Sequence, residues 1–250
     1  MPTPPDLLAV LIDADNISAD RIGSVLREIA SFGTASVKRV YGDWTKTNLR
    51  SWKEAASAHV IQPIQQFDNT AGKNATDSAL IIDAMDLLYT GRFSGFCIVS
   101  SDSDFTRLAS RIRENGVTVH GFGEQKTPES FRNACDRFTY VEVIGGALVG
   151  DSAVPVAPKR RVRSELRSDT KLVSALRSSV ESASTETGWA HLSAVGSLLR
   201  KQQPDFDARN WGYSKLSDLI VATDLFAMEP LPVGGFQVRT KPKGAVSPAP

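Results

Sequence analysis

Residues 7–16 read LLAVLIDADN, and this stretch decides the fold. Its first six residues are apolar and carry no charge, which is typical of a strand buried on both faces of a parallel sheet. The run leads directly into Asp13 and Asp15. Because ligand sites of open parallel sheets form beyond the carboxyl ends of the strands, these acids predict a functional site at the end of the first strand.

Working outward from this strand, short apolar runs alternate with helical patterns as far as about Ile144. Strands are predicted over residues 7–12, 36–41, 59–64, 95–100 and 117–122. Helices are predicted around residues 22–29, over 76–89 and over about 104–115, with Gly33, Gly91 and Gly116 expected just beyond their ends. This alternation predicts an α/β fold, in which helices cover both faces of a parallel sheet.

A second cluster of acids follows the predicted strand over residues 95–100. Residues 100–104 read SSDSD and supply Asp102 and Asp104, while Asp77 lies near the start of the predicted helix over 76–89. The carboxyl ends of parallel strands meet at one edge of a sheet. We therefore expect Asp13, Asp77, Asp102 and Asp104 to converge there, and Asp15 and Asn16 are weaker candidates.

Converging carboxylates repel each other, and a divalent cation removes that repulsion. Oxygen ligands with no nearby Cys or His favour Mg²⁺ or Mn²⁺. Such an ion polarises a phosphodiester and lowers the pKa of a water molecule, so the expected reaction is phosphodiester hydrolysis. Asp13 and Asp102 are the first candidate ligands, followed by Asp77 and Asp104.

An alternative interpretation stays open for each acid, because an Asp after a strand also caps helices or accepts turn amides. Asp104 is a candidate cap for the helix beside it, and Asp15 a candidate for the next turn. Asp83 is expected to support the site or the fold without binding the ion. Lys73 is either a phosphate contact or a solvated loop lysine.

Four separated motifs resemble the NYN domain, a nuclease domain with a PIN-like fold. They are residues 11–16 (LIDADN), Lys73 with Asp77 and Asp83, residues 100–105 (SSDSDF) and residues 113–121 (RENGVTVHG). The resemblance spans residues 6–145 and implies a PIN-like three-layer sandwich with a central parallel sheet. It also implies endoribonuclease activity and a metal ion held by Asp13, Asp77, Asp102 and Asp104. Ser101 departs from the family, which more often has glycine there.

Beyond Gly145 the pattern fades into small residues and then reaches the basic run Lys159-Arg160-Arg161-Val162-Arg163. Residues 146–165 are predicted to be a linker, whose basic run is either a solvated spacer or a contact for phosphate through Arg160 and Arg161. Apolar spacings further on predict three helices and a closing β-hairpin, the pattern of a winged helix. Residues 241–250 are expected to be disordered.

Residues 192–196 (LSAVG), 204–207 (PDFD) and 211–216 (WGYSKL) resemble the OST-HTH or LOTUS module over residues 166–240. The resemblance implies a winged-helix domain that binds RNA, and a second copy of the chain or another protein as a further partner. Arg200, Lys201, Arg209 and Lys215 are candidate RNA contacts. Trp211 and Tyr213 either stack on bases or belong to the core of this small domain. Single-stranded or structured RNA is the expected ligand.

Composition sets limits on these predictions. No apolar run approaches the roughly 20 residues of a membrane span, and the first residues lack a secretory signal, so a cytoplasmic protein is expected. Cys97 and Cys135 are expected to be buried thiols. The net charge of +1 excludes a uniformly basic coat but not local basic patches.

Two rival functions remain open at this stage. One is a non-catalytic RNA-binding or protein-interaction regulator that keeps the metal site, and the other is a phosphatase acting on small phosphate esters. Dinucleotide binding is disfavoured, because the predicted loop after the first strand is Asp-Ala-Asp-Asn and has no glycines.

Overall fold

A computed structural model describes residues 6–67, 75–144 and 159–242 of the chain. The chain divides into two compact units, Met1–Ala157 and Pro158–Pro250, and each is described by itself. Among the described residues, no helix is both long enough and apolar enough to cross a membrane.

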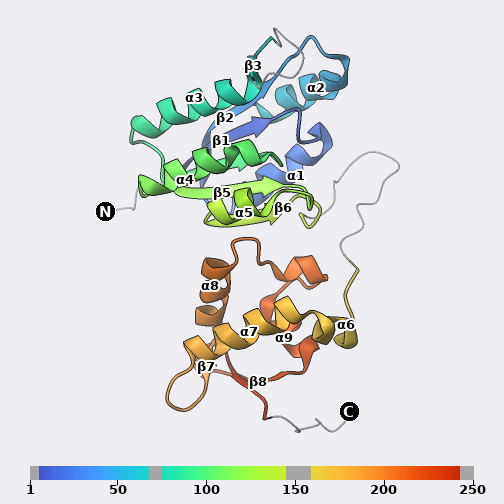
Figure 1. Ribbon diagram of the computed structural model, residues 1–250, viewed down its shortest axis with the longest axis vertical. Coiled ribbons are helices and arrows are strands. Elements are labelled where there is room, and N and C mark those ends of the chain that lie inside the picture. Colours follow the sequence, from blue (N-terminus) through green and yellow to red (C-terminus); the bar gives the residue numbers. More distant parts are fainter. Residues whose placement is uncertain (1–5, 68–74, 145–158, 243–250) are drawn as a thin grey trace. The chain divides into compact units, whose positions relative to one another are not determined.

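The first unit alternates strands and helices along the chain (Figure 1). In order, its elements are β1 (Leu7–Asp13), α1 (Ala19–Ile29), β2 (Thr34–Gly42), the 3₁₀ turn η1 (Thr47–Leu49), α2 (Arg50–His59), β3 (Gln62–Gln65), α3 (Ala75–Tyr89), β4 (Gly95–Val99), the 3₁₀ turn η2 (Ser103–Phe105), α4 (Thr106–Glu114), β5 (Thr118–Gly123), α5 (Glu129–Ala134) and β6 (Arg137–Tyr140).

The strands form one six-stranded sheet in the order β3-β2-β1-β4-β5-β6, and every pairing is parallel. The chain moves outward from β1 to β3 on one side and from β4 to β6 on the other. The order of strands therefore reverses between β1 and β4, and the acids that follow these two strands lie at this switch point.

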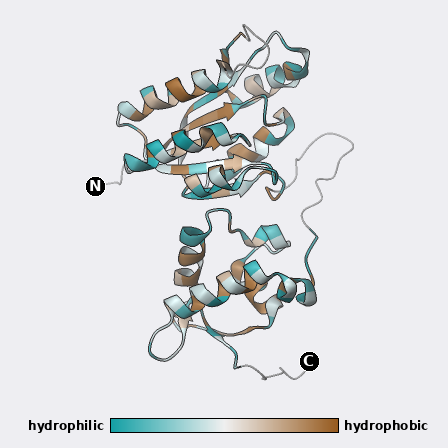
Figure 2. Cartoon of the chain, viewed as in Figure 1, coloured by the Kyte–Doolittle hydropathy of each residue, from teal (hydrophilic) through white to brown (hydrophobic). Residues whose placement is uncertain are grey.

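Strand β1 explains why the sheet has two covered faces. Val10 and Ile12 pack with residues of α1 and α2, whereas Ala9 and Leu11 pack with residues of α3, α4 and α5. Residues of a strand alternate between the two faces, so an uninterrupted apolar run fits a middle layer. In Figure 2 hydrophobic colour runs along this central strand. The α/β sandwich predicted from residues 7–16 is confirmed.

The structure corrects the strand predicted over residues 59–64. His59 is the last residue of α2, Val60 adopts a left-handed conformation with φ of 52°, and β3 begins only at Gln62. The apolar pair Val60 and Ile61 suggested a strand, but Val60 is 79% exposed where the helix ends. Helices α2 and α5 and strand β6 were not predicted, because their apolar residues are few and their lengths short.

Two predicted helix ends also need correction. Helix α1 ends at Ile29 with Ala30 as its cap, so Gly33 does not terminate it. Gly33 instead permits a close approach, because a Cβ atom there would lie 2.4 Å from the carbonyl oxygen of Asp6. The helix predicted from about Asp104 starts as the turn η2 and continues as α4 from Thr106. Gly91 and Gly116 follow α3 and α4 with positive φ angles, as expected.

The second unit contains the three predicted helices followed by the predicted hairpin. Its elements are α6 (Arg163–Ser168), α7 (Thr170–Ala183), β7 (Ala190–His191), α8 (Leu192–Gln202), the 3₁₀ turn η3 (Ala208–Trp211), α9 (Leu216–Thr223), β8 (Phe226–Pro230) and β9 (Phe236–Thr240). Strands β7, β9 and β8 form an antiparallel sheet in that order. Leu172, Leu176, Val195, Leu199 and Leu219 contribute to its separate core.

The boundaries of the second unit differ from the predicted ones. Residues 159–165, predicted as linker, belong to this unit, and α6 starts within them at Arg163. Residues 146–158 lie outside the described residues. At the other end, Lys241 was predicted to lie in a disordered tail, but its Nζ atom lies 2.6 Å from Oδ1 of Asp224.

Gly123, the last residue of β5, gives a test of the packing at the functional edge. A Cβ atom there would lie 2.6 Å from the carbonyl oxygen of Ser100 and 2.6 Å from Oγ1 of Thr127. We expect Gly123→Ala to destabilise the first unit by about 2 kcal/mol, measured by urea unfolding, because neither atom can withdraw freely. Thr118→Ala, at an exposed position of the same strand, is the control. Equal stability of the two variants would contradict this account.

Candidate metal centre

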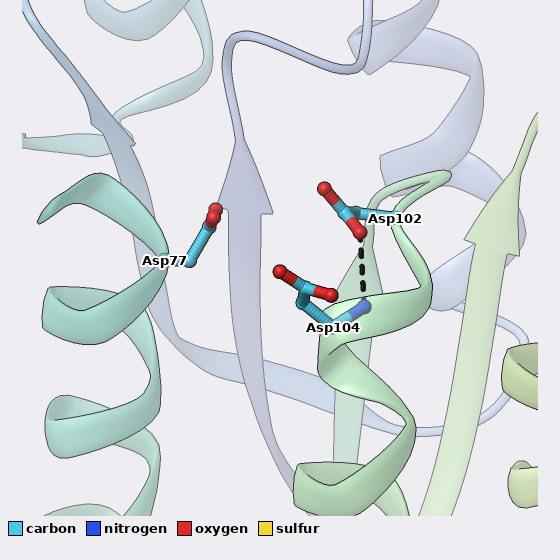
Figure 3. Close-up of side chains that lie close together, drawn as sticks. All are labelled: Asp77, Asp102 and Asp104. Atoms are coloured by element: carbon cyan, nitrogen blue, oxygen red, sulfur yellow. Dashed lines mark hydrogen bonds between the residues drawn. The ribbon is translucent and has the colours of Figure 1, made fainter. Parts of the chain in front are cut away.

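Three of the predicted acids converge at the switch point. Asp77, Asp102 and Asp104 each offer one carboxylate oxygen, and these oxygens lie within 4.8 Å of one another. Asp77 comes from the first turn of α3, whereas Asp102 and Asp104 come from the segment around η2 (Figure 3). A set of three carboxylates from separate parts of the chain matches the hard oxygen ligands that Mg²⁺ and Mn²⁺ prefer.

Asp102 and Asp104 are held by a local cap. Oδ1 of Asp102 accepts the backbone N–H of Asp104 at 2.9 Å, so Asp102 is the N-cap of η2. The candidate cap was Asp104, and the structure gives that role to Asp102 instead. A carboxylate has two oxygens, so capping by one leaves the other for a cation. Capping and metal binding are therefore compatible roles for Asp102.

Asp13 occupies a different position from the other three acids. It is completely buried at the end of β1 and does not belong to the group within 4.8 Å. Its Oδ2 accepts hydrogen bonds from Ser100 Oγ and Asn16 Nδ2, both at 2.7 Å, and its Oδ1 accepts the N–H of Asp15 at 3.0 Å. Burial raises the pKa of Asp13, although these three hydrogen bonds oppose the shift.

Ser100 connects Asp13 to the candidate ligands. Its hydroxyl donates to Asp13 and accepts the backbone N–H of Asp102 at 3.0 Å. The end of β1 is thus linked through one buried hydroxyl to the loop after β4. Ser100 lies in the motif SSDSDF, but no role was predicted for it. The feature that could have indicated one is a hydroxyl two residues before Asp102 at the end of a strand.

The charge on Asp77 shows the cost of bringing these acids together. Its pKa is raised to about 6, first by burial and then by the negative charges of Asp13, Asp102, Asp104 and Asp15. Each of these effects opposes ionisation of Asp77 in the absence of a counter-ion. A divalent cation among the carboxylates reverses this balance, so the residues present fit such an ion.

Ser101, which departs from the family pattern, has a structural role. It is buried, and its Oγ accepts the backbone N–H of Glu124 at 2.8 Å. Glu124 follows β5, so this bond links the ends of β4 and β5. The serine side chain contributes a hydrogen bond that glycine lacks, and it displaces none of the three acids.

The remaining acids near this edge have other partners. Oδ2 of Asp83 accepts hydrogen bonds from Arg39 at 2.9 Å and Tyr41 at 2.8 Å, which joins α3 to β2. Asp15 lies 3.8 Å from Nζ of Lys46. Lys73 lies outside the described residues.

Asp43, just beyond the end of β2, was not singled out from the sequence. It is buried and accepts hydrogen bonds from Thr45 Oγ1 at 2.6 Å and Gln65 Nε2 at 3.0 Å. The signal in the sequence was an acid near the end of a predicted strand, as for Asp13, although this strand also contains Lys38 and Arg39. Its partners show it organising the loop after β2.

The candidate RNA contacts of the second unit fall into two groups. Arg200, Lys201 and Lys215 are exposed, as are Arg160 and Arg161. Arg209 is only partly exposed, and its Nη2 atom lies 2.7 Å from Oδ2 of Asp207. Arg209 therefore forms an ion pair with Asp207, two residues before it in the chain.

Tyr213 belongs to the core of the second unit, and Trp211, which is partly buried, packs against that core; core packing was the alternative to base stacking. Tyr213 is 4% exposed, and its hydroxyl donates to the carbonyl of Arg161 at 2.7 Å. Nε1 of Trp211 donates to Asp169 at 3.0 Å, and its ring packs against Phe206 with centroids 5.4 Å apart. The Tyr213 ring is therefore buried, whereas the Trp211 ring keeps part of its surface exposed.

A parallel α/β sandwich with acids at its switch point is the architecture of PIN-like nuclease domains, and sequence comparison agrees with it. The NYN domain family matches residues 7–142, and the OST-HTH/LOTUS domain matches residues 167–238. Because the first match spans more than half of the chain, the chain belongs to the NYN domain family, and it carries an OST-HTH/LOTUS domain after it.

Two solved structures are similar to parts of the chain. A crystal structure of a protein of unknown function from Vibrio parahaemolyticus is 16% identical, with a TM-score of 0.45, and the match covers 56% of this chain and 96% of that one. A solution NMR structure of an uncharacterized protein from Nitrosomonas europaea is 30% identical, with a TM-score of 0.27, over 41% of this chain and 94% of that one. No curated protein matches the chain.

Ser100→Ala tests the link between β1 and the loop after β4. The substitution removes a donor from the buried carboxylate of Asp13 and an acceptor from the N–H of Asp102. We expect a loss of about 2 kcal/mol in unfolding free energy, because a buried acid is left with one hydrogen bond fewer. Ser103→Ala, an exposed neighbour, is the control. If both variants unfold at the same urea concentration, the link contributes nothing.

Asp77→Asn tests the repulsion among the acids. The pKa of Asp77 is about 6 in the folded protein and ordinarily 3.8, so the folded state holds its proton more tightly. Stability due to this group is therefore present at low pH and is lost as the pH rises through about 6. With EDTA present at pH 7.5, we expect Asp77→Asn to stabilise the first unit by on the order of 1 kcal/mol, a value reduced for screening by solvent.

Thermal melting at two pH values checks this expectation. The advantage of Asp77→Asn should shrink toward zero at pH 4, where the parent carboxyl is protonated. Asp86→Asn removes an exposed acid from the same helix and should show a smaller effect at pH 7.5. A lower melting temperature for Asp77→Asn than for the parent at pH 7.5 would contradict the assignment.

Proposed function

We propose that this protein is a metal-dependent endoribonuclease, in which the NYN domain hydrolyses RNA phosphodiester bonds and the OST-HTH/LOTUS domain binds the RNA. The observation that carries the proposal is the convergence of Asp77, Asp102 and Asp104 within 4.8 Å at the switch point of the sheet. Membership of the NYN domain family supports nuclease chemistry at this edge.

In this proposal Asp77, Asp102 and Asp104 hold Mg²⁺ or Mn²⁺. When bound, such an ion polarises a phosphodiester and lowers the pKa of a water molecule, which favours hydrolysis. Asp102 uses one oxygen to cap η2 and keeps the other for the ion. Asp77 gives up its proton more readily once the positive charge offsets the neighbouring acids.

Asp13 was the first candidate ligand in the sequence, and we propose a supporting role for it. Its Oδ2 already accepts two hydrogen bonds and its Oδ1 accepts one. The carboxylate therefore fixes Ser100 and, through it, the loop that carries Asp102. Its negative charge also acts on Asp77, so Asp13 increases the attraction of the edge for a cation.

The rival function is a regulator that binds RNA and a metal ion without turnover. The hydrogen bonds that occupy Asp13 favour this rival, because a site with fewer direct carboxylate ligands holds its ion less firmly. A nuclease and a regulator of this kind would have the same fold, the same acids and the same RNA-binding domain. Only a measurement of cleavage separates them.

Cleavage of end-labelled RNA in Mn²⁺ tests the proposal. We expect the parent to cut RNA internally, EDTA to stop the reaction, and Asp102→Asn to slow it at least about 100-fold through loss of a charged ligand. The fold of this variant should persist, because the amide oxygen of asparagine can still accept the N–H of Asp104. Asp86→Asn, on the exposed side of α3, is the matched control and should cut like the parent.

The outcomes distinguish the candidates. Cleavage by Asp102→Asn at the rate of the parent would refute the assignment of this residue. RNA binding by a parent that cuts no RNA in Mn²⁺ or Mg²⁺ would support the regulator instead. Hydrolysis of a phosphomonoester such as p-nitrophenyl phosphate without cleavage of RNA would favour the phosphatase.

A further inference from the structure

The helices of the second unit differ sharply in charge. In helix-turn-helix proteins the second helix of the motif lies in the groove of the nucleic acid and reads base edges. Helix α9, with the sequence LSDLIVAT, is the last helix of this unit and follows α8 as the second helix of such a motif would. It contains no Lys or Arg, and its one charged residue is Asp218. This helix is therefore poorly suited to contact a polyanion.

Positive charge gathers instead around α6 and the residues before it. Lys159, Arg160 and Arg161 line a hollow of about 590 Å³, whose other lining residues include Glu165 and Asp169. Arg161 lies 3.4 Å from Asp169. Among the described residues, no carboxylate forms an ion pair with Lys159 or Arg160, and both side chains are exposed.

A second group of cations gathers around Asp224, where Arg163 and Arg167 lie on a side of α6 that does not line the hollow. Arg163 and Arg167 lie 3.2 Å and 3.1 Å from Oδ2 of Asp224, and Lys241 lies 2.6 Å from its Oδ1. These cations hold the pKa of Asp224 below its usual range, with the hydrogen bond from Lys241 as the largest cause. One carboxylate neutralises one of three positive charges, so this group also has a positive excess.

We define the α6 face by its six cations: Lys159, Arg160, Arg161, Arg163, Arg167 and Lys241. The acids that lie among them are Glu165, Asp169 and Asp224. The face therefore carries an excess of three positive charges, although the whole chain has a net charge of only +1. Such a local excess attracts an anionic partner.

The α6 face is held in place by hydrogen bonds to the core of the unit. The backbone N–H of Arg161 donates to the carbonyl of Trp211 at 3.1 Å, and Tyr213 donates to the carbonyl of Arg161. The guanidinium of Arg160 lies 4.5 Å from the centroid of the Tyr213 ring. Arg167 donates to the carbonyls of Thr223 and Asp224 at the end of α9. Cations fixed in this way lose little conformational entropy when an anion binds.

The same contacts decide which part of a nucleic acid this face can recognise. Arg160 and the backbone of Arg161 cover Tyr213, and Trp211 is engaged by Asp169 and Phe206. Among the described residues of this face, Tyr213 is buried and Trp211 is partly buried, so little aromatic surface is presented for a base to stack on. Guanidinium and ammonium groups can bind guanine edges as well as phosphate. Without a stacking surface to hold a base in place, contacts to phosphate oxygens dominate, and these contacts carry no sequence information.

We propose that the α6 face binds the phosphodiester backbone of RNA and does so with little regard to sequence. The inference rests on the proposed function in that it takes RNA as the ligand, and it adds the surface and the mode of recognition. The OST-HTH/LOTUS domain then provides affinity for RNA, and it does not select the phosphodiester bond that is cut.

Binding is measured with the full-length chain carrying Asp102→Asn, so that cleavage does not interfere. The test variant is the pair Lys159→Gln with Arg160→Gln. The comparison variant, called the α8 control, is Arg200→Gln with Lys201→Gln, which removes the same charge from the end of α8, where two other candidate RNA contacts lie. Fluorescence anisotropy with RNAs of equal length and unrelated sequence gives Kd at several salt concentrations. A third variant, Lys159→Arg with Arg160→Lys, keeps the charges.

We expect the test variant to weaken RNA binding about tenfold and to reduce the slope of log K against log salt by about 1.5. The charge-keeping variant should bind like the parent, and the α8 control should lose less affinity than the test variant. Kd values for unrelated RNA sequences should agree within about threefold. Thermal melting of each variant verifies that the second unit is folded.

Three results would overturn the inference. The first is a larger loss of affinity in the α8 control than in the test variant, which would move the RNA to α8. The second is a preference of about tenfold or more for one RNA sequence, which would require contacts to bases. The third is RNA affinity unchanged by the test variant, while an acidic peptide loses its binding, which would make the ligand a protein. Each result is independent of whether the parent cleaves RNA.

Discussion

The hydrogen bond between the buried carboxylate of Asp13 and the hydroxyl of Ser100 is the contact on which the functional edge depends. It joins the ends of the two central strands, β1 and β4, at the point where the order of strands reverses. The hydroxyl passes the constraint on to the amide of Asp102, and Asp102 in turn caps the turn that carries Asp104. Two of the three converging acids are therefore positioned from one buried residue.

The third acid, Asp77, is positioned by other contacts. Asp77 comes from α3, and α3 is attached to β2 through Asp83, Arg39 and Tyr41. The fold thus assembles the acids from opposite sides of β1 and keeps them close in spite of their mutual repulsion. Strained arrangements of this kind persist at functional sites because the rest of the structure stabilises them. A fold selected only for stability would have separated these charges.

Much of this arrangement could be predicted from the sequence, because it depends on local patterns. The uninterrupted apolar run before Asp13 predicts a doubly covered strand, and acids directly after strands predict their meeting at one edge. The distinction between Asp13 and the other acids could not be predicted. It depends on the burial of the Asp13 carboxylate and on its hydrogen bond with Ser100. These two residues are 87 residues apart in the sequence. Short elements such as β6, and Val60 at the end of α2, likewise depend on tertiary packing.

The second unit also has a feature that could not be predicted from the sequence. The basic run at residues 159–163 is typical of a solvated linker, yet Trp211 and Tyr213 hold it against the core. The backbone carbonyl of Trp211 and the hydroxyl of Tyr213 make these contacts, and the Tyr213 ring is buried as a result, so positive charge is the main feature of the surface above it.

The attachment of α3 at Asp83 has a mechanical consequence. Asp77 precedes Asp83 by six residues, and at a rise of 1.5 Å per residue the two lie about 9 Å apart along the helix axis. The apolar side of the same helix is buried in the core through Leu80, Ala84 and Leu88, so Asp83 is one of several contacts that hold α3 against the sheet. The position of Asp77 is therefore set by the packing of a whole helix, and a core substitution that shifts α3 would change the separation of the acids without altering any of them.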